Sequence, residues 1–581
     1  MMSEAERPWL NSYPDEVSPT IDAHAYENIN ELFEDSCRRY ASHTAFINMS
    51  GRMTYGDLAV LSERFASFLQ HQLHLGRGDR MALMMPNLMQ YPVCYFGALR
   101  AGLTIININP LYTPRELLLQ LQDCEAQAIV VLENFAARLA GILRKTRLRH
   151  VIITRIGDCL GRRGVLINFY LKWIKSAVPS FRIRDAISLR DALRLGARRP
   201  STPVTVHYDD LALLQYTGGT TGRAKGAMLT HGNILANIAQ CHGMYGPVLV
   251  RGEEKIVTAI PLYHVFAMTV NMLFLFSLGG TNLLITDPRR IRDFIRDLQR
   301  HADLTVLVGV NTLFNALLHF RVFDTIRFTR LKLAIGGGAA IQSGVARRFH
   351  EATGIHILEG YGLTECSPLV CVCPYTTTSY TGTIGIPVPS TEVRILDEDG
   401  SVITALDTPG ELTVRGPQVM QGYYHNDLAT RAALSADGFC RTGDIAVWKE
   451  GGYLKIIDRI KDMILVSGFN VYPAEIEDVV SQLEGVVECA AIGVPSDATG
   501  EGVCLYVVPR EGSALDEKAV RSFCRTSLTG YKVPREIIFT AQLPHTTVGK
   551  VSRRLLRESY SRQFYRETPS GAQLAAPPGR T

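Results

Sequence analysis

Residues 211–226 read LALLQYTGGTTGRAKG, an apolar run that passes directly into hydroxyls, glycines and a lysine. The apolar part predicts a buried strand, and the polar part follows at its carboxyl end. Glycines let backbone N–H groups curl round an anion, while threonine hydroxyls and a lysine add donors and charge, which is typical of a polyphosphate cradle. The Walker A spacing does not fit. A solvated glycine-rich turn would explain the glycines alone. The candidate binding residues here are Tyr216, Thr217, Gly218, Gly219, Thr220, Thr221, Gly222 and Lys225.

Strand-like and helix-like segments alternate on both sides of this loop. Apolar runs predict strands at 80–85, 104–109 and 128–132 upstream, and at 304–310, 331–338 and 355–362 downstream, with helical patterns between them. This βαβ repetition predicts an α/β fold with two wound subdomains and mainly parallel sheets.

The pattern of predicted secondary structure changes after about residue 376. Shorter alternating strands with Gly and Pro turns predict a barrel-like β portion, and a small α+β unit follows the charged run 458–462. We therefore expect a large N-terminal domain over 1–460, a small mobile C-terminal domain over 461–562 and a flexible tail over 563–581.

Composition excludes several classes of protein. The chain has 581 residues, of which 46% are apolar and 20% charged, so it has room for several packed domains and is not disordered. A formal charge of +5 is too small for bulk electrostatic binding of nucleic acid. The 12 cysteines lie scattered and no secretory signal is visible at the N-terminus, which favours reduced thiols in the cytosol.

Residues 256–286 form an uncharged run, IVTAIPLYHVFAMTVNMLFLFSLGGTNLLIT. It exceeds the roughly 20 residues that cross a bilayer. However, Pro, His, Asn and Gly interrupt it, and its two ends resemble buried strands. We expect a buried strand-helix-strand unit, and a membrane-embedded carrier is the alternative.

Two further clusters carry chemistry. EGYGLTE at 359–365 follows a predicted strand, and ligands of wound α/β folds bind beyond such strand ends. Tyr361 could stack on a purine, and Glu365 could hold Mg²⁺ that bridges phosphate oxygens. Asp444 and Arg459 suit ribose hydroxyls, although each could instead form a surface salt bridge.

Together these motifs resemble the adenylate-forming superfamily and, within it, bacterial long-chain fatty-acid–CoA ligases. The resemblance extends from about Trp9 to about Tyr560, through PLYTPREL, LQYTGGTTGRAKGAMLTH, PLYHVFAM, GVNTLFNAL, EGYGLTECSP, DGFCRTGDIAVW, DRIKDMILVSGFNVYPAEIEDVV, LTGYKVP and VGKVSRR. It implies ATP-dependent activation of long-chain fatty acids to acyl-CoA through an acyl-adenylate, with release of AMP and pyrophosphate. The product would enter fatty-acid degradation or lipid synthesis.

The resemblance also implies roles for individual residues. Lys550 would be the catalytic lysine, Lys461 the hinge between the domains, and Glu365 with Thr217 the Mg²⁺ site. The residues around ATP would include Gly338, Glu359, Gly360, Tyr361, Gly362, Thr364, Asp444 and Arg459. The acyl pocket would involve His264, Phe266, Val310 and Gly336. His264 has an alternative, which is a core histidine whose ring nitrogens form hydrogen bonds within the protein.

Two departures from the family pattern bear on acyl-length preference and on domain rotation. Cys440-Arg441 stand where the family usually has an apolar residue and His, and Ile460 replaces a basic residue. An amino-acid-activating domain is the main rival, but PLYHVFAM offers no carboxylate for an ammonium group, and an unpaired buried charge is costly.

A basic, acid-free stretch at 161–184 mixes six cations with four aromatic residues. This pattern suits an anionic membrane surface, and a helix with a solvated basic face is an equal alternative. We expect a cytoplasmic enzyme in peripheral contact with the inner face of the cell membrane, and a homodimer is possible.

Overall fold

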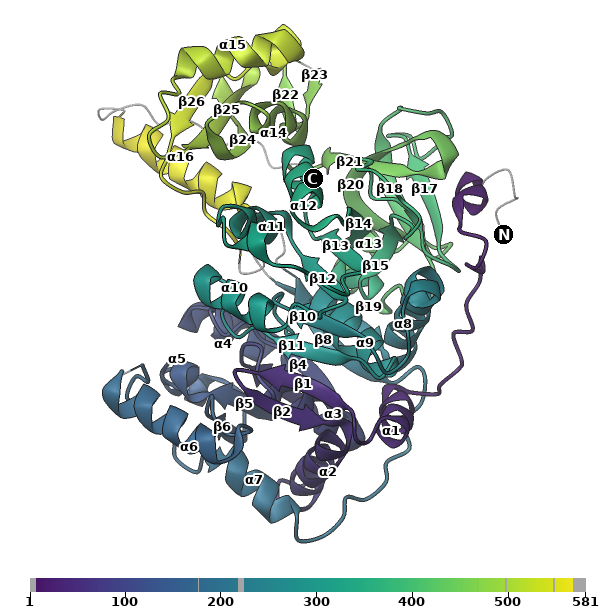
Figure 1. The fold of residues 1–581 in the computed structure, drawn as a ribbon, viewed down its shortest axis with the longest axis vertical. Helices are drawn as coiled ribbons and strands as arrows, with labels where there is room; N and C mark the ends of the chain where they lie inside the picture. The colour runs from purple at the N-terminus through teal and green to yellow at the C-terminus, as the bar shows by residue number, and fades with distance from the viewer. Residues whose placement is uncertain are drawn as a thin grey trace. The chain divides into compact units, whose positions relative to one another are not determined.

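The structure is a computed structural model that describes residues 7–175, 177–217, 224–467, 469–496, 499–546 and 549–567. The chain divides into two compact units, a large one over Met1–Ile456 and a small one over Ile457–Thr581. Each unit has its own hydrophobic core. Figure 1 labels the elements of both.

The first sheet of the large unit has eight strands. Its order is β19 (Gly422–Tyr423), β9 (Lys225–Thr230), β8 (Leu211–Thr217), β4 (Thr104–Asn107), β3 (Arg80–Met84), β5 (Ala128–Leu132), β6 (His150–Thr154) and β7 (Ile187–Ser188). The strands from β8 to β7 run parallel, and β9 turns back antiparallel to β8. Strands such as β5 are buried on both faces, which is why they read as continuous apolar runs.

The second sheet has nine strands. Its order is β16 (Ile386–Pro387), β15 (Leu369–Val372), β14 (Ile357–Gly362), β13 (Leu333–Gly337), β12 (Val306–Gly309), β10 (Lys255–Thr258), β11 (Thr281–Leu284), β1 (Thr44–Asn48) and β2 (Gly51–Thr54). The central strands from β14 to β1 run parallel, so β13 and β14 present their carboxyl ends at one edge.

The α-helices of the large unit pack between and around these sheets (Figure 1). They are α1 (Ile29–Arg39), α2 (Tyr55–His71), α3 (Gln90–Arg100), α4 (Pro114–Cys124), α5 (Ala136–Ala140), α6 (Gly161–Phe169), α7 (Leu189–Gly196), α8 (His231–Tyr245), α9 (Leu275–Ser277), α10 (Ile291–Arg300), α11 (Asn311–Leu318), α12 (Ser343–Thr353) and α13 (Asp427–Ala433). Local sequence sets their starts: Thr113 and Glu116 form a capping box before α4, and Pro114 occupies the first turn.

The uncharged run folds as a buried strand-helix-strand unit, as expected. β10 and β11 enclose a π-helix, η7 (Ala267–Phe274), whose residues are all buried. The buried Asn271 side chain donates through Nδ2 to the Val257 carbonyl oxygen at 3.2 Å, so the donor of this polar group finds an acceptor inside the run. In the described part of the chain, no helix combines the length and the hydropathy that a bilayer crossing requires.

A four-stranded sheet completes the large unit. Its order is β17 (Glu392–Leu396), β18 (Gly410–Arg415), β20 (Cys440–Trp448) and β21 (Leu454–Arg459), and β21 runs across the boundary between the units. The pairs β17–β18 and β18–β20 are antiparallel. The predicted α/β fold class, with two wound subdomains in a large N-terminal domain and a small α+β C-terminal domain, is confirmed. The portion predicted to be barrel-like is this four-stranded sheet.

The small unit is a five-stranded sheet with three α-helices. Its strands are β22 (Ile464–Val466), β23 (Phe469–Val471), β24 (Val486–Ser496), β25 (Gly500–Pro509) and β26 (Glu536–Phe539), and its helices are α14 (Pro473–Ser481), α15 (Glu517–Ser527) and α16 (Arg553–Glu567). Helix α16 continues beyond residue 562, where the flexible tail was predicted to begin. Residues 568–581 lie outside the described part of the chain.

Candidate active site

The strands on either side of the glycine-rich loop form a hairpin. Thr217, the last residue of β8, pairs with Lys225, the first residue of β9. The predicted cradle residues Gly218, Gly219, Thr220, Thr221 and Gly222 lie outside the described residues. Because they are paired, Thr217 and Lys225 stand side by side at the base of the loop.

Glu365 lies close to this base. It belongs to a single 3₁₀ turn, η9 (Thr364–Cys366), which follows β14 and packs against β8 and β9. The Tyr423 hydroxyl donates to Glu365 Oε1 at 2.7 Å, and the ring of Tyr423 lies under the Lys225 ammonium at 5.1 Å. Burial and the Glu365 carboxylate raise the pKa of Tyr423, so the phenol stays protonated as a donor. Three strand ends thereby bring a carboxylate, a phenol and a cation together.

The side chain of Tyr216 points to the other face of the sheet. Its hydroxyl donates to Asp123 on α4, and its ring packs over the backbone of Gly226. Burial is the main cause that raises the pKa of Tyr216, with Asp123 adding to it. Tyr216 therefore anchors the end of β8, whereas Thr217, the next residue along the strand, faces the opposite side.

The carboxyl ends of β13 and β14 lie next to each other. Gly337 pairs with Gly360, and Gly338 follows at a positive φ of 81°, which only glycine adopts readily. The Glu359 carboxylate is buried and accepts a hydrogen bond from the Ile341 N–H at 3.0 Å. Gly362 is also constrained, because a Cβ there would lie 2.0 Å from the Pro368 carbonyl oxygen.

Tyr361 and Asp444 are in direct contact. The Tyr361 hydroxyl donates to Asp444 Oδ2 at 2.6 Å, although the two residues come from different sheets, β14 and β20. The Asp444 backbone N–H donates to Thr442 Oγ1 at 3.1 Å within β20. One oxygen of Asp444 is thus fixed by the tyrosine that the sequence motif assigns to the adenine.

The predicted acyl-pocket residues are only partly brought together. A Cβ at Gly337 would lie 3.1 Å from the ring of Phe266, so Phe266 packs directly on this glycine. A Cβ at Gly336 would instead meet Ile341 and Ile357, which belong to a core on the other face of the sheet. Val310 precedes α11 and is buried, and His264 Nδ1 accepts from the Phe266 N–H at 3.3 Å.

The remaining predicted site residues belong to the small unit. Arg459 ends β21, and Lys461 lies in a turn that is closed by the Asp462 N–H donating to the Arg459 carbonyl at 3.0 Å. Lys550 lies in a tight loop: its carbonyl accepts from the Thr546 N–H at 2.6 Å, and its own N–H donates to Thr546 Oγ1 at 3.1 Å.

Sequence reasoning missed three residues of this region: Asp123, Gly337 and Tyr423. Gly337 directly follows Gly336, which the sequence analysis assigned to the acyl pocket. Successive residues of a strand face opposite sides of the sheet, so a known contact of either glycine would have shown which one faces Phe266. Tyr423 lies on a two-residue strand without a pattern of its own. Its role depends on pairing with β9, which no local signal indicates.

Comparison with known proteins places this arrangement in a family. The AMP-binding enzyme family matches residues 33–424, and the AMP-binding enzyme C-terminal domain matches residues 475–550. The chain therefore belongs to the AMP-binding enzymes.

Curated relatives show that, among these enzymes, the chain belongs to the bacterial long-chain-fatty-acid–CoA ligases. The long-chain-fatty-acid–CoA ligase of Salmonella typhi is 52% identical over 95% of this chain and 98% of its own length. The enzyme of the same name from Haemophilus influenzae is 48% identical over the same shares. Among solved structures, ATP-bound MatB from Rhodopseudomonas palustris is similar to this chain with a TM-score of 0.80 and 30% sequence identity. The similarity covers 92% of this chain and 100% of the MatB chain.

Proposed function

We propose that this enzyme joins a long-chain fatty acid to coenzyme A at the expense of ATP, through an acyl-adenylate, and releases AMP and pyrophosphate. The observation that carries the proposal is the convergence of Glu365, Tyr423 and Lys225 at the base of the glycine-rich loop. A free carboxylate has no good leaving group, and a phosphoric anhydride supplies one. The site therefore needs cations and donors for a polyphosphate together with a pocket for an apolar chain.

In the first step, a carboxylate oxygen of the fatty acid attacks the α-phosphorus of ATP. The bond to the bridging oxygen breaks, and pyrophosphate leaves with that electron pair. Lys225 and the residues 217–222 stabilise the phosphates, and Lys550 neutralises charge that develops at the α-phosphate. In the second step the thiol of coenzyme A loses its proton, the sulfur attacks the acyl carbonyl, and AMP leaves.

The residues present fit Mg²⁺. Magnesium prefers hard oxygen ligands and usually takes one or two carboxylates plus substrate phosphates rather than an all-protein cage. Glu365 supplies a carboxylate, and Thr217 at the end of β8 supplies a hydroxyl. The hydrogen bond from Tyr423 orients the carboxylate. When bound there, the cation would neutralise phosphate charge.

The adenosine part of ATP would be held by the ends of β13 and β14. Gly338, Glu359 and Gly360 leave room for the flat purine, and the ring of Tyr361 stacks on it. Because the Tyr361 hydroxyl fixes one oxygen of Asp444, the carboxylate is oriented to accept from ribose hydroxyls. In this proposal Arg459 donates to the same ribose.

The purified enzyme with ATP, Mg²⁺, CoA and a long-chain fatty acid is expected to form acyl-CoA, AMP and pyrophosphate in equal amounts. Nucleotide chromatography and a pyrophosphate assay check this. A panel of fatty, aromatic and amino acids serves as the control for substrate class. Release of ADP and phosphate would contradict the proposal, and so would a preference for amino acids.

We also propose that α6 and the π-helical turn after it, η5 (Tyr170–Ile174), contact an anionic membrane surface. Leu166, Phe169, Trp173 and Ile174 are each more than half exposed, at 72%, 58%, 67% and 65%. Their spacing places them along one face of the helix. Lys172 lies over the ring of Trp173 at 5.5 Å. Exposed apolar side chains next to cations suit the boundary between headgroups and acyl chains, where a long fatty acid concentrates.

Replacing Arg163, Lys172 and Lys175 with Gln is expected to weaken binding to anionic vesicles and to spare turnover of detergent-dispersed substrate. Each cation contributes about 1 kcal/mol near an anionic leaflet, and salt weakens the attraction. Vesicle sedimentation at low and high salt measures the effect.

A triple Gln variant at the exposed positions Arg321, Arg327 and Lys518 is the control for net charge. It should bind vesicles nearly as well as the parent. Equal sedimentation of the α6 variant and the parent would show that this helix does not dock on membranes.

A further inference from the structure

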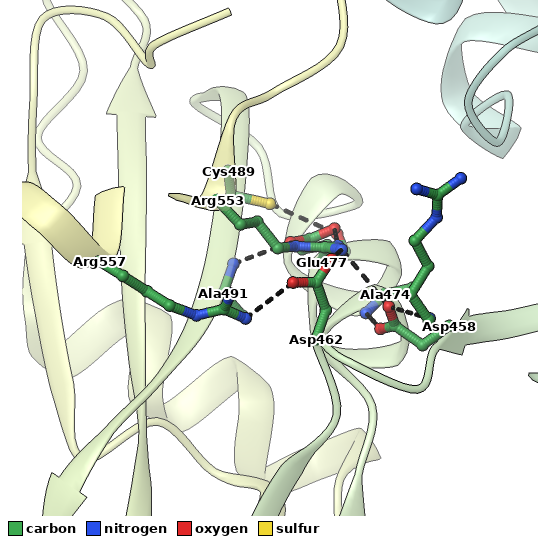
Figure 2. Close-up of polar contacts among 9 residues, drawn as sticks. Asp458, Asp462, Ala474, Glu477, Cys489, Ala491, Arg553 and Arg557 are labelled. Atoms are coloured by element: carbon green, nitrogen blue, oxygen red, sulfur yellow. Dashed lines mark hydrogen bonds and ion pairs between the residues drawn. The ribbon is translucent and has the colours of Figure 1, made fainter. Parts of the chain in front are cut away.

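Five charged side chains meet in the small unit and belong to none of the sites described above. We call them the Arg553 cluster, and its members are Arg553, Arg557, Asp458, Asp462 and Glu477 (Figure 2). Arg553 binds Glu477 through two nitrogens, with Nη2 at 2.7 Å from Oε2 and Nε at 3.2 Å from Oε1. Its Nη1 lies 3.4 Å from Asp458 Oδ1 and 3.5 Å from Asp462 Oδ2. Arg557 Nη2 donates to Asp462 Oδ1 at 2.8 Å.

The carboxylates of the cluster are fixed in place by backbone groups. Asp458 Oδ2 accepts from the Ala474 N–H at the start of α14, at 2.9 Å. Glu477 Oε1 accepts from the Ala491 N–H of β24 at 2.8 Å. The guanidinium of Arg553 is therefore held by carboxylates from β21, from the turn that follows it and from α14 (Figure 2).

The cluster is largely shielded from water. The side chain of Asp458 is 2% exposed and that of Arg553 is 19% exposed. Burial raises the pKa of Asp458, while the charge of Arg553 opposes that rise. Burial acts to lower the pKa of Arg553, but Glu477 and Asp458 outweigh it and raise the pKa above its usual value. Removing one member would therefore leave buried charges without partners.

The position of the cluster in the chain connects two functional segments. Asp458 and Asp462 stand on either side of Lys461, the predicted hinge residue. Arg553 begins α16, separated from Lys550 only by Val551 and Ser552. The same guanidinium thus holds both residues 458–462, which we call the hinge segment, and helix α16, which begins just after Lys550.

Hydrogen bonds also join the described residues on the two sides of Lys550, 544–546 and 549–552, which we call the lysine loop. In addition to the two bonds between Thr546 and Lys550, the Ser552 N–H donates to the Pro544 carbonyl at 2.7 Å. His545 Nε2 lies 2.7 Å from Glu488 Oε1 on β24, and the neighbouring carboxylate raises the pKa of His545. One end of the loop is tied to β24 by His545, and the other end is tied to the hinge segment by Arg553.

We propose that Arg553 is a positioning residue for acyl-adenylate formation, which acts by holding the Lys550 loop against the hinge segment. This rests on the proposed function, in which Lys550 serves the first step. A displacement of about 1 Å in a catalytic group can cost about 100-fold in rate. Loss of the guanidinium frees the start of α16 and with it the end of the loop.

The test compares the two half-reactions in Arg553→Gln. We expect pyrophosphate formation from fatty acid and ATP to fall roughly 10- to 100-fold, and thioester formation from preformed acyl-adenylate to fall less than about threefold. In the Lys550→Ala background, Arg553→Gln should cause no further loss of the first step, because residues that act as one unit are not additive. Arg553→Lys keeps the charge without the two-nitrogen fork and should recover only part of the rate.

Arg554→Gln is the matched control, because Arg554 is exposed and pairs with Glu558 one helical turn away. It should leave both half-reactions unchanged. If Arg553→Gln is not recovered as a folded protein, Glu477→Gln takes its place and is compared in the parent and in the Lys550→Ala background in the same way. Equal losses in both half-reactions, or a further loss in the Lys550→Ala background, would overturn the positioning role. A parent enzyme that forms no pyrophosphate would instead overturn the proposed function.

Discussion

Lys550→Ala is expected to lower the rate of acyl-adenylate formation by about 100- to 1,000-fold, the typical cost of one preorganised charge-stabilising group. The loss is confined to the first half-reaction, because only there does the α-phosphate gain negative charge in the transition state. Thioester formation from preformed acyl-adenylate should change by less than about threefold. Quenched-flow measurement of pyrophosphate, and of acyl-CoA from added adenylate, separates the two steps.

Lys518→Ala provides the matched control, since Lys518 is an exposed lysine on α15 of the same unit. This substitution should leave both rates at the level of the parent. If Lys550→Ala loses both half-reactions to the same extent, the lysine serves binding or folding, and the proposed division of labour between the steps is wrong.

Lys461→Pro is expected to produce the opposite pattern, with adenylate formation retained and thioester formation lowered by roughly 100-fold. Proline fixes φ near −65° and also restricts the residue before it. Lys461 lies in the short turn closed by the Asp462 N–H and the Arg459 carbonyl. If Lys461 is the hinge that the resemblance implies, a backbone that cannot change its dihedral angles there stops the small domain from rotating between the two half-reactions.

Lys461→Ala separates backbone freedom from side-chain charge. It removes the ammonium but keeps the dihedral freedom, so it should support both half-reactions within about threefold of the parent. If Ala and Pro at this position have the same effect, the charge of Lys461 matters and not its backbone. Circular dichroism of both variants checks that the turn still folds.

Much of this fold is already predictable from short segments. A parallel strand covered on both faces is an uninterrupted apolar run, and this local property identified the strands around 80–84, 128–132 and 333–337. The glycine-rich loop and EGYGLTE are equally local, because each follows the end of such a strand. By themselves these motifs indicate a nucleotide site, and the reaction class follows from the resemblance that they and the other sequence blocks show to a known family.

The contacts that complete the site depend on long-range pairing. Tyr423 reaches Glu365 across 58 positions of sequence, and Tyr361 reaches Asp444 across 83. Neither pair shares a periodic pattern, since the first joins β19 to the turn η9 and the second joins strands of two different sheets. Of the two neighbouring glycines, the sequence analysis assigned Gly336 to the proposed acyl pocket together with Phe266, whereas it is Gly337 that packs against Phe266.

The sequence by itself indicated the alternation of strands and helices and the glycine-rich motif, because each depends on residues that are neighbours in the chain. The reaction class came from the resemblance of many such motifs, taken in order, to a known family. Only the tertiary structure decided that the uncharged run is buried, that the face of α6 is exposed, and that Arg553 joins Asp458 across 95 positions. Burial and exposure are properties of what packs against a segment, and a local pattern of apolar residues is compatible with either. The ion pairs of Arg553 likewise need all their partners folded before the charges can be taken out of water.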